Sequence, residues 1–117
     1  MEYCTKNGIQ IGAYGSLGAA ESHNAHQMKD GKHVLLDHPV ISKMSVKHNK
    51  TAAQILIRYG IDNGCTVIPK STNPKRIEEN FNVFDFELGT DDIAEISSIS
   101  TKIQQNVKFA WDPSKIV

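Results

Sequence analysis

The chain has 117 residues, with 13 basic and 13 acidic side chains, so its formal net charge is zero. A neutral chain has no global field that would attract nucleic acid or a membrane surface, and neither is expected as a partner. The length suits one modest domain with a single core.

The first residues, MEYCTKNG, lack the apolar stretch of a signal peptide, and no apolar run approaches the length of a membrane span. Cys4 and Cys65 are the only cysteines and lie far apart in the sequence. Without a secretory signal, this cysteine usage favours reduced thiols and a cytoplasmic location. A structural disulfide between the two is the alternative.

The first half of the chain begins with a strand pattern. GIQIGAY (residues 8–14) alternates and is β-rich, which predicts a buried strand that ends at the turn GSLG. Residues 19–33 are polar and have no period, which predicts a long surface loop. Asp37 or His38, just before Pro39, would then begin a helix that runs to about His48.

The clearest helix pattern follows in TAAQILIRYGIDNG. Thr51 can cap its start, Gln54 stands where a capping-box partner belongs, and Asn63-Gly64 ends it. CTVIP (residues 65–69) reads as a second strand. Because this run is nearly all apolar, it fits a strand that is covered on both faces, as in parallel sheets.

The last third predicts two more helices. One runs from Pro74 to about Asn82, with Asn73 as its cap, and FDFEL then forms an extended link. Thr90 is expected to cap the last helix, whose first turn carries two aspartates that suit the positive end of the helix dipole. The tail from Lys102 onward shows no clear periodicity.

The order of these elements is a βαβα pattern, whose crossover favours a parallel pair of strands. Two parallel strands do not form a stable domain by themselves. The sequence therefore looks like part of something larger.

A candidate phosphate site lies where the second strand runs into a helix. Lys70 and Arg76 supply positive charge there, and Ser71, Thr72 and Asn73 offer side-chain donors. A helix start adds a partial positive charge and unpaired backbone N–H groups. The alternative is a solvated helix start with a few surface cations, and the residues alone favour neither.

A second candidate, AYGSLG, follows the first strand. Gly12, Gly15 and Gly18 are spaced three apart, which is not the dinucleotide fingerprint G-x-G-x-x-G. Tyr14 could offer a flat ring for stacking, although a core aromatic before a tight turn is the alternative. His23 and His26 are close in the loop but lack the four ligands of a structural zinc site, so no metal is expected.

Three segments together resemble the C-terminal part of an aldo-keto reductase: IGAYGSLG, KHNKTAAQILIRY and VIPKSTNPKRIEENFNVFDFEL. The resemblance implies an α/β fold, a C-terminal fragment of a TIM (β/α)₈ barrel that transfers hydride between NADPH and a carbonyl compound. Residues 1–117 would then be a partial aldo-keto reductase domain with two parallel βα units, a final helix and a tail.

The resemblance also implies a role for individual residues, with NADP(H) as the cofactor. Tyr14 would stack under the nicotinamide ring. The turn beside the pyrophosphate would be formed by Gly15, Ser16 and Leu17, although the family commonly has Ser where this chain has Gly15. The 2′-phosphate would be met by Lys70, Ser71, Thr72 and Arg76, and the adenine by Glu79 and Asn80.

The family's catalytic tetrad of Asp, Tyr, Lys and His lies on the earlier part of the barrel, and no segment of this chain matches its motifs. No catalytic residue is therefore assigned. One hypothesis is the NADPH-binding C-terminal part of a carbonyl reductase. The other is a non-catalytic truncated paralogue or fragment that acts at most as a cofactor-binding or interaction module. The resemblance specifies neither the carbonyl substrate nor an oligomeric state.

Overall fold

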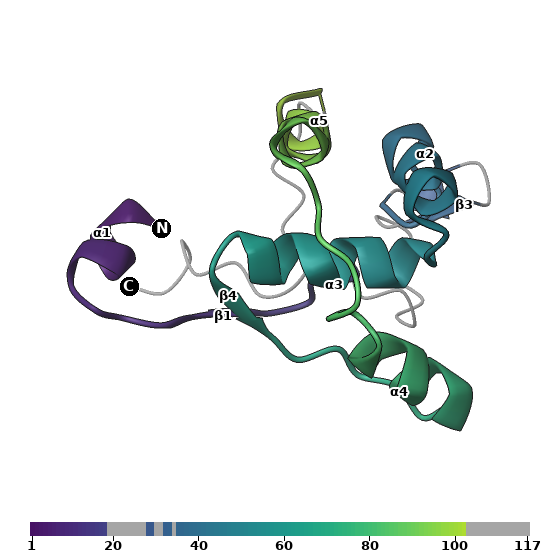
Figure 1. Cartoon of the computed structure of the whole chain (residues 1–117), viewed down its shortest axis with the longest axis horizontal. Helices are drawn as coiled ribbons and strands as arrows, with labels where there is room; N and C mark the ends of the chain where they lie inside the picture. Colours follow the sequence, from purple (N-terminus) through teal and green to yellow (C-terminus); the bar gives the residue numbers. More distant parts are fainter. Residues whose placement is uncertain (19–27, 30–31, 34, 103–117) are drawn as a thin grey trace.

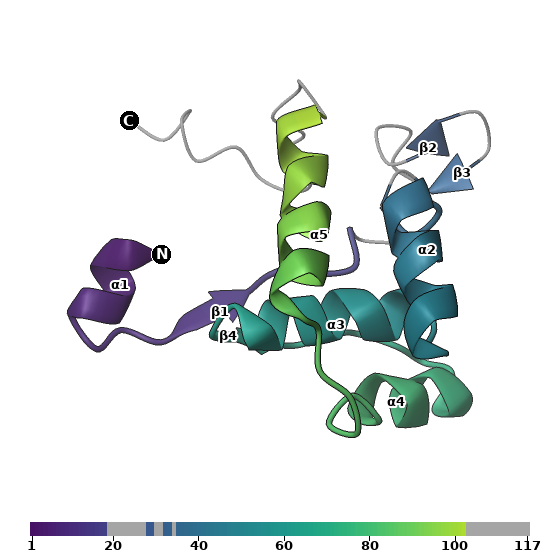
Figure 2. The same cartoon turned by 45° about the horizontal axis from the view of Figure 1, so that its top comes forward.

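The computed structural model describes residues 1–18, 28–29, 32–33 and 35–102. The elements are, in chain order, α1 (Glu2–Lys6), β1 (Ile11–Ala13), β2 (Met28–Lys29), β3 (Lys32–His33), α2 (Pro39–His48), α3 (Ala52–Asp62), β4 (Cys65–Val67), α4 (Pro74–Phe81) and α5 (Thr90–Lys102). Helix α3 crosses the middle of the molecule, and α2 and α5 stand together on one side of it (Figures 1 and 2). Strands β1 and β4 and helix α4 lie on its other side.

Strands β1 and β4 form a parallel pair, as the βαβα order predicts. Ile11 stands opposite Cys65, and Ala13 stands opposite Val67. The chain crosses between the two strands through α2 and α3, and α3 packs against β4. The fold is therefore α/β, and the ends of the two strands coincide at the same edge.

The prediction that both strands are buried is wrong for one of their faces. Ile11 and Val67 are half-buried on the side that α3 covers, whereas Gly12 and Thr66, which alternate with them, are exposed. Strand residues point alternately to opposite faces. The apolar character of these strands suits a sheet with two covered faces, and the described residues cover only one.

Three predicted helix starts are confirmed by their capping bonds. The Nδ1 atom of His38 accepts a hydrogen bond from the backbone N–H of Val40 at 3.2 Å. Thr51 and Gln54 form a reciprocal capping box at the start of α3. Asn73 caps α4 ahead of Pro74. In each case a side chain satisfies backbone donors that the first helical turn leaves unpaired.

The structure also contains a short helix and a short two-stranded ladder that were not predicted from the sequence. Helix α1 has no buried residue and stands apart from the other helices (Figure 1). Within the predicted surface loop, β2 and β3 form an antiparallel ladder that pairs Met28 with His33. The dipeptide Asp-Gly stands between them in the sequence and favours two-residue hairpins. It was the signal in the sequence from which this ladder could have been predicted. Residues 19–27 of that loop and the tail from 103 lie outside the described residues.

The start of α5 differs from the prediction by one position. Thr90 is the first helical residue rather than the cap, and the helical bonding begins with the N–H of Ile93 donating to the carbonyl of Gly89 at 3.0 Å. Asp92 reaches back and accepts from the N–H of Gly89 at 3.2 Å. The aspartate in the third helical position therefore caps this end from inside the helix.

The core lies where α2, α3 and α5 meet. Its buried apolar residues are Ile41, Met44, Ile55, Leu56, Leu88, Ile96 and Ile99. The apolar faces of three helices thus bury one another and fix α3, which in turn carries the strands.

Over the residues that the structure describes, no helix is long and apolar enough to cross a membrane. Both cysteines are free thiols.

Helix α3 and strand β4 approach each other closely at Gly60. A methyl group placed on Gly60 would lie 2.8 Å from the Cγ1 atom of Val67. We expect the steric clash in Gly60→Ala to cost more than the higher helix propensity of alanine contributes. The net effect should be a loss of about 1 kcal/mol in the free energy of unfolding. In a Val67→Ala background, where that contact is absent, the same change should stabilise the chain. Urea titration of the four variants measures both effects, and a destabilisation that persists in the second background would contradict this account.

Candidate functional site

The two segments that the sequence analysis singled out lie at the same edge of the parallel pair. Tyr14 directly follows β1, and Lys70 lies three residues after the end of β4. Because the strands are parallel and Ala13 stands opposite Val67, the chain leaves both strands at the same edge. In α/β folds, ligands bind at this carboxyl edge. The topology therefore brings together two candidate segments that are more than 50 residues apart in the sequence.

Tyr14 is not a core residue, so the alternative interpretation of this aromatic is wrong. Its side chain is 83% exposed, and the strand period of two places it on the open face with Gly12. The ring is therefore available to a planar ligand.

The turn after Tyr14 explains why position 15 is a glycine. Gly15 has a φ of +64°, which favours glycine, and its carbonyl accepts from the N–H of Gly18 at 2.7 Å. A serine, the residue that the resemblance leads one to expect here, would be strained in this conformation. Leu17 is half-buried and packs against the core.

The start of α4 differs from the expectation that its backbone N–H groups are unpaired. The Oδ1 atom of Asn73 accepts from the N–H groups of Lys75 at 3.0 Å and Arg76 at 3.3 Å. The carbonyl of Asn73 accepts from Ile77 at 3.0 Å, and Pro74 has no N–H. An anion at this point would therefore meet the helix dipole and the side chains rather than free backbone donors.

The side chains around that helix start carry positive charge and hydroxyl groups. Lys70, Thr72 and Arg76 are exposed, and Ser71 is half-buried. The Oγ atom of Ser71 accepts from the N–H of Asn73 at 3.1 Å, which fixes the turn and leaves the hydroxyl proton to donate elsewhere. Two cations and two hydroxyl groups thus lie within residues 70–76, a donor set suited to a phosphate group.

The two residues that the resemblance relates to adenine lie near the end of α4. Asn80 is half-buried and lines a groove together with Lys70 and Ser71. The carboxylate of Glu79 lies 3.9 Å from the ammonium of Lys75, one helical turn earlier. Asn80 and Arg76 are four residues apart, so they share a face of the helix.

Gln54 determines where this helix lies, a role that local sequence patterns did not reveal. Its Oε1 atom accepts from the N–H of Thr51 at 2.9 Å, as the capping box predicts. Its Nε2 atom also donates to the carbonyls of Glu79 at 3.1 Å and Asn82 at 3.0 Å. One buried amide therefore begins α3 and ends α4, and its second set of partners lies 25 and 28 residues further on.

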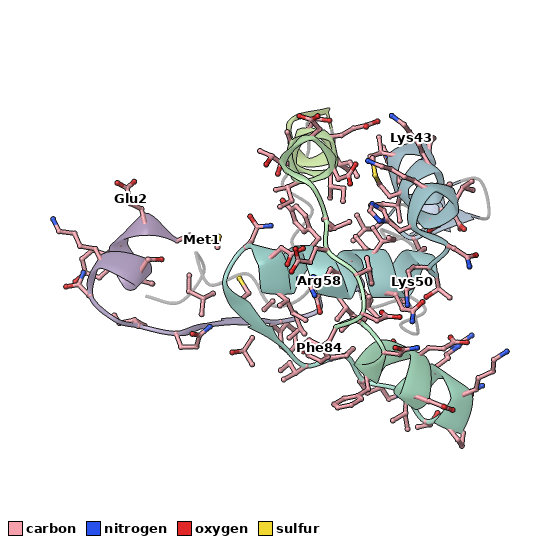
Figure 3. All side chains as sticks on the ribbon, viewed as in Figure 1. Met1, Glu2, Lys43, Lys50, Arg58 and Phe84 are labelled. Carbon is pink, nitrogen blue, oxygen red and sulfur yellow. The ribbon has the colours of Figure 1, made fainter. Side chains whose placement is uncertain are left out.

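The segment after α4 is held against α3 by hydrogen bonds to an ion pair that lies within α3. Arg58 donates to Asp62 at 2.8 Å and to the carbonyl of Val83 at 3.1 Å, and the hydrogen bond to Asp62 raises the pKa of its guanidinium. Asp62 in turn accepts from the N–H of Leu88 at 3.2 Å. Figure 3 shows Arg58 on α3 beside this segment. The bonds at both ends of the segment fix the positions of α4 and α5 relative to α3.

Metal chemistry receives no support from the part of the chain that the structure describes, where no group of three His, Cys, Asp or Glu side chains could hold an ion. His38 is used as a helix cap. His23 and His26 lie outside the described residues.

Comparison with known proteins identifies relatives along nearly the whole chain. It is 40% identical over 114 residues to an NADPH-dependent D-xylose reductase of Meyerozyma guilliermondii, covering 96% of this chain and 36% of that protein. Over 69 residues it is 55% identical to an aldo-keto reductase of a Mycobacterium species, covering 59% of this chain and 25% of that protein. The chain thus spans about a third or less of the length of the relatives it matches.

The solved structures agree with this result. An aldo-keto reductase from a Medee basin deep-sea metagenome library matches with a TM-score of 0.72 and 41% identity, covering 95% of this chain and 37% of that one. The parallel pair and its helices correspond to part of the TIM barrel of these enzymes. The model of the aldo/keto reductase family matches residues 1–101. This chain belongs to the aldo/keto reductase family.

Proposed function

We propose that this chain is the NADP(H)-binding part of an aldo/keto reductase barrel that reduces a small carbonyl compound. The observation that carries the proposal is the parallel register of β1 and β4, which puts Tyr14 and the basic segment at one edge. When bound, the cofactor supplies hydride for the reduction. The residues of this chain would hold and orient the cofactor, and the proton donor would come from another part of the barrel.

The chemistry of the available groups fits NADP(H). The exposed ring of Tyr14 offers a flat surface for the nicotinamide. Lys70 and Arg76, with the hydroxyl groups of Ser71 and Thr72, suit the 2′-phosphate that distinguishes NADPH from NADH. Membership of the family and the relative named as NADPH-dependent support the same cofactor.

The preference for the 2′-phosphate provides the test. We expect the chain to bind 2′,5′-ADP at least about tenfold more tightly than 5′-ADP, because each charge-assisted hydrogen bond contributes about 1.5–3 kcal/mol. Arg76→Ala should abolish most of this difference and leave the affinity for 5′-ADP nearly unchanged. Dissociation constants for both nucleotides follow from NMR titrations of residues 1–117.

Lys75→Ala is the matched control, since Lys75 is the neighbouring cation on α4 and lies against Glu79. It should weaken both nucleotides by the same small factor. Equal affinity of the unaltered chain for the two nucleotides, or equal loss of both in Arg76→Ala, would count against the phosphate assignment.

A further inference from the structure

Two asparagine–glycine pairs occupy equivalent places in the fold. Asn7 and Gly8 follow helix α1, and Asn63 and Gly64 follow helix α3, in both cases ahead of a strand of the parallel pair. Each glycine has a positive φ, +68° for Gly8 and +77° for Gly64. Asparagine followed by glycine is prone to cyclise, because no side chain hinders the glycine nitrogen as it attacks the side-chain carbonyl carbon.

The same hydrogen bonds hold both pairs back from this reaction. The side-chain amide of each asparagine donates to the backbone carbonyl four residues earlier, at 2.7 Å in both helices. The N–H of each glycine donates to the carbonyl three residues earlier, at 3.2 Å in α1 and 2.8 Å in α3. The attacking nitrogen and the amide that would leave are therefore both occupied, and cyclisation requires the helix end to open.

The two helices differ in what resists that opening. Helix α1 has five residues and buries none of them, and Tyr3, which holds the Asn7 amide, is 73% exposed. Tyr59, which holds the Asn63 amide, packs against the core from a helix of 11 residues, four of them buried. A helix as short as α1 is marginal without tertiary packing. Local opening of α1 therefore costs little free energy, whereas opening the end of α3 disrupts packed residues.

A contact between distant segments adds to the protection of Asn63. The Nε2 atom of Gln10 donates to the carbonyl of Gly64 at 2.9 Å, although 54 residues separate the two. Gly64 is thus held through its N–H by α3 and through its carbonyl by the segment that leads into β1. Cys65, the next residue, begins β4. The same bonds therefore protect Asn63 and fix the chain where it enters the parallel pair.

We propose that Asn7 is a site of spontaneous covalent modification, and that Asn63 is protected from the same reaction by the packing of α3. The backbone nitrogen of Gly8 forms a bond to the Cγ atom of Asn7 and gives up its proton. The bond between Cγ and Nδ2 breaks, and ammonia leaves. Water, the only co-reactant, then opens the five-membered imide at either carbonyl, which yields aspartate or isoaspartate.

Either product weakens α1 further. Both lack the Nδ2 donor that binds the carbonyl of Tyr3, and both place a carboxylate near the negative end of the helix dipole. Isoaspartate also lengthens the main chain between α1 and β1 by one atom. The modification should therefore release α1, while β1 stays paired with β4 through the register from Ile11 to Ala13.

The test compares rates of modification in the full chain with those in two synthetic peptides, residues 1–13 and 57–69, which are too short to keep a helix in water. Chromatography and mass spectrometry of digests give the aspartate and isoaspartate formed at each position during incubation at neutral pH. The rate at Asn7 should agree between chain and peptide within about threefold, whereas the rate at Asn63 should be about tenfold or more lower in the chain.

Gly8→Ala tests the chemical route. A methyl group placed on Gly8 meets nothing within 4 Å, so the change creates no clash. It strains the positive φ and loosens the cap, yet it hinders the attacking nitrogen, so most of the modification at Asn7 should be lost. An unchanged or faster rate in this variant would overturn the proposal. Equal ratios of chain to peptide rates at the two asparagines, or slow modification of Asn7 relative to its peptide, would also overturn it.

Discussion

Replacement of Asp92 by alanine is expected to detach α5 from α2 and lower the stability of that contact by about 3 kcal/mol. The carboxylate is 3% exposed and accepts from the ammonium of Lys47 at 2.6 Å and from Gly89 N–H at 3.2 Å. The Oδ2 atom, which accepts from Gly89, also lies 2.9 Å from the Nε2 atom of His48. Removing a buried charge that has these partners leaves them unpaired, which typically costs 3–5 kcal/mol. The partial exposure of Lys47 places the expectation at the low end.

Hydrogen exchange measures this effect locally. Amides of α5 should lose roughly 100-fold of their protection in Asp92→Ala, while those of α4 keep theirs. Asp91→Ala is the matched control, because Asp91 occupies the same helical turn and is exposed. Equal loss in both variants would show that charge near the helix start, rather than the buried contact, is responsible.

Because the contact between α5 and α2 depends on the ionised carboxylate of Asp92, we expect this contact to weaken in acid. The hydrogen bond from Lys47 lowers the pKa of Asp92, against the opposing effect of burial, and His48 and the Gly89 N–H lower it further. Because the pKa of Asp92 is lower in the folded state, its stabilisation is fully present at a pH above the pKa of the unfolded chain, about 4. The stabilisation is lost as the pH falls through the pKa of the folded state. Protection of α5 amides should therefore fall below about pH 4, and Asp92→Asn should flatten that dependence.

Replacement of Gln54 by glutamate is expected to displace the end of α4, with a loss of about 2–4 kcal/mol. Glutamate keeps the oxygen that accepts from Thr51 but removes the donor to the carbonyls of Glu79 and Asn82. Each buried acceptor left unpaired costs about 1–3 kcal/mol, and a carboxylate facing two carbonyls adds repulsion. Gln54→Met, which fills the same space without charge, should cost less.

Exchange of α4 amides and binding of 2′,5′-ADP measure the consequence for the site. Both variants should lose protection in α4, whereas α5 remains protected because Asp92 is intact. If α4 carries the phosphate-binding residues, affinity for 2′,5′-ADP should fall in parallel with its protection. Unchanged protection of α4 in Gln54→Glu would rule out this role for the glutamine.

Local chemistry was sufficient to locate most of the helices in the sequence. The starts at His38, Thr51 and Asn73 are capped by the side chains that the sequence indicated, because a cap acts within three residues of its own position. The short ladder of β2 and β3 and the shifted start of α5 were missed. The Asp-Gly dipeptide was the signal for the ladder, and the start of α5 moves by one residue because Asp92 accepts from the N–H of Gly89.

The sequence by itself determined the parallel order of the strands, the family and the residue types of the candidate site, since these depend on spacing and on motifs such as IPKSTNPKRIEEN. Only the tertiary structure decided that Tyr14 is exposed and that Gln54 ends a helix 25 residues away. The physical reason is that exposure and hydrogen-bond satisfaction depend on neighbours that are distant in the sequence. A residue pattern specifies what a side chain can do, and packing determines which partner it finds.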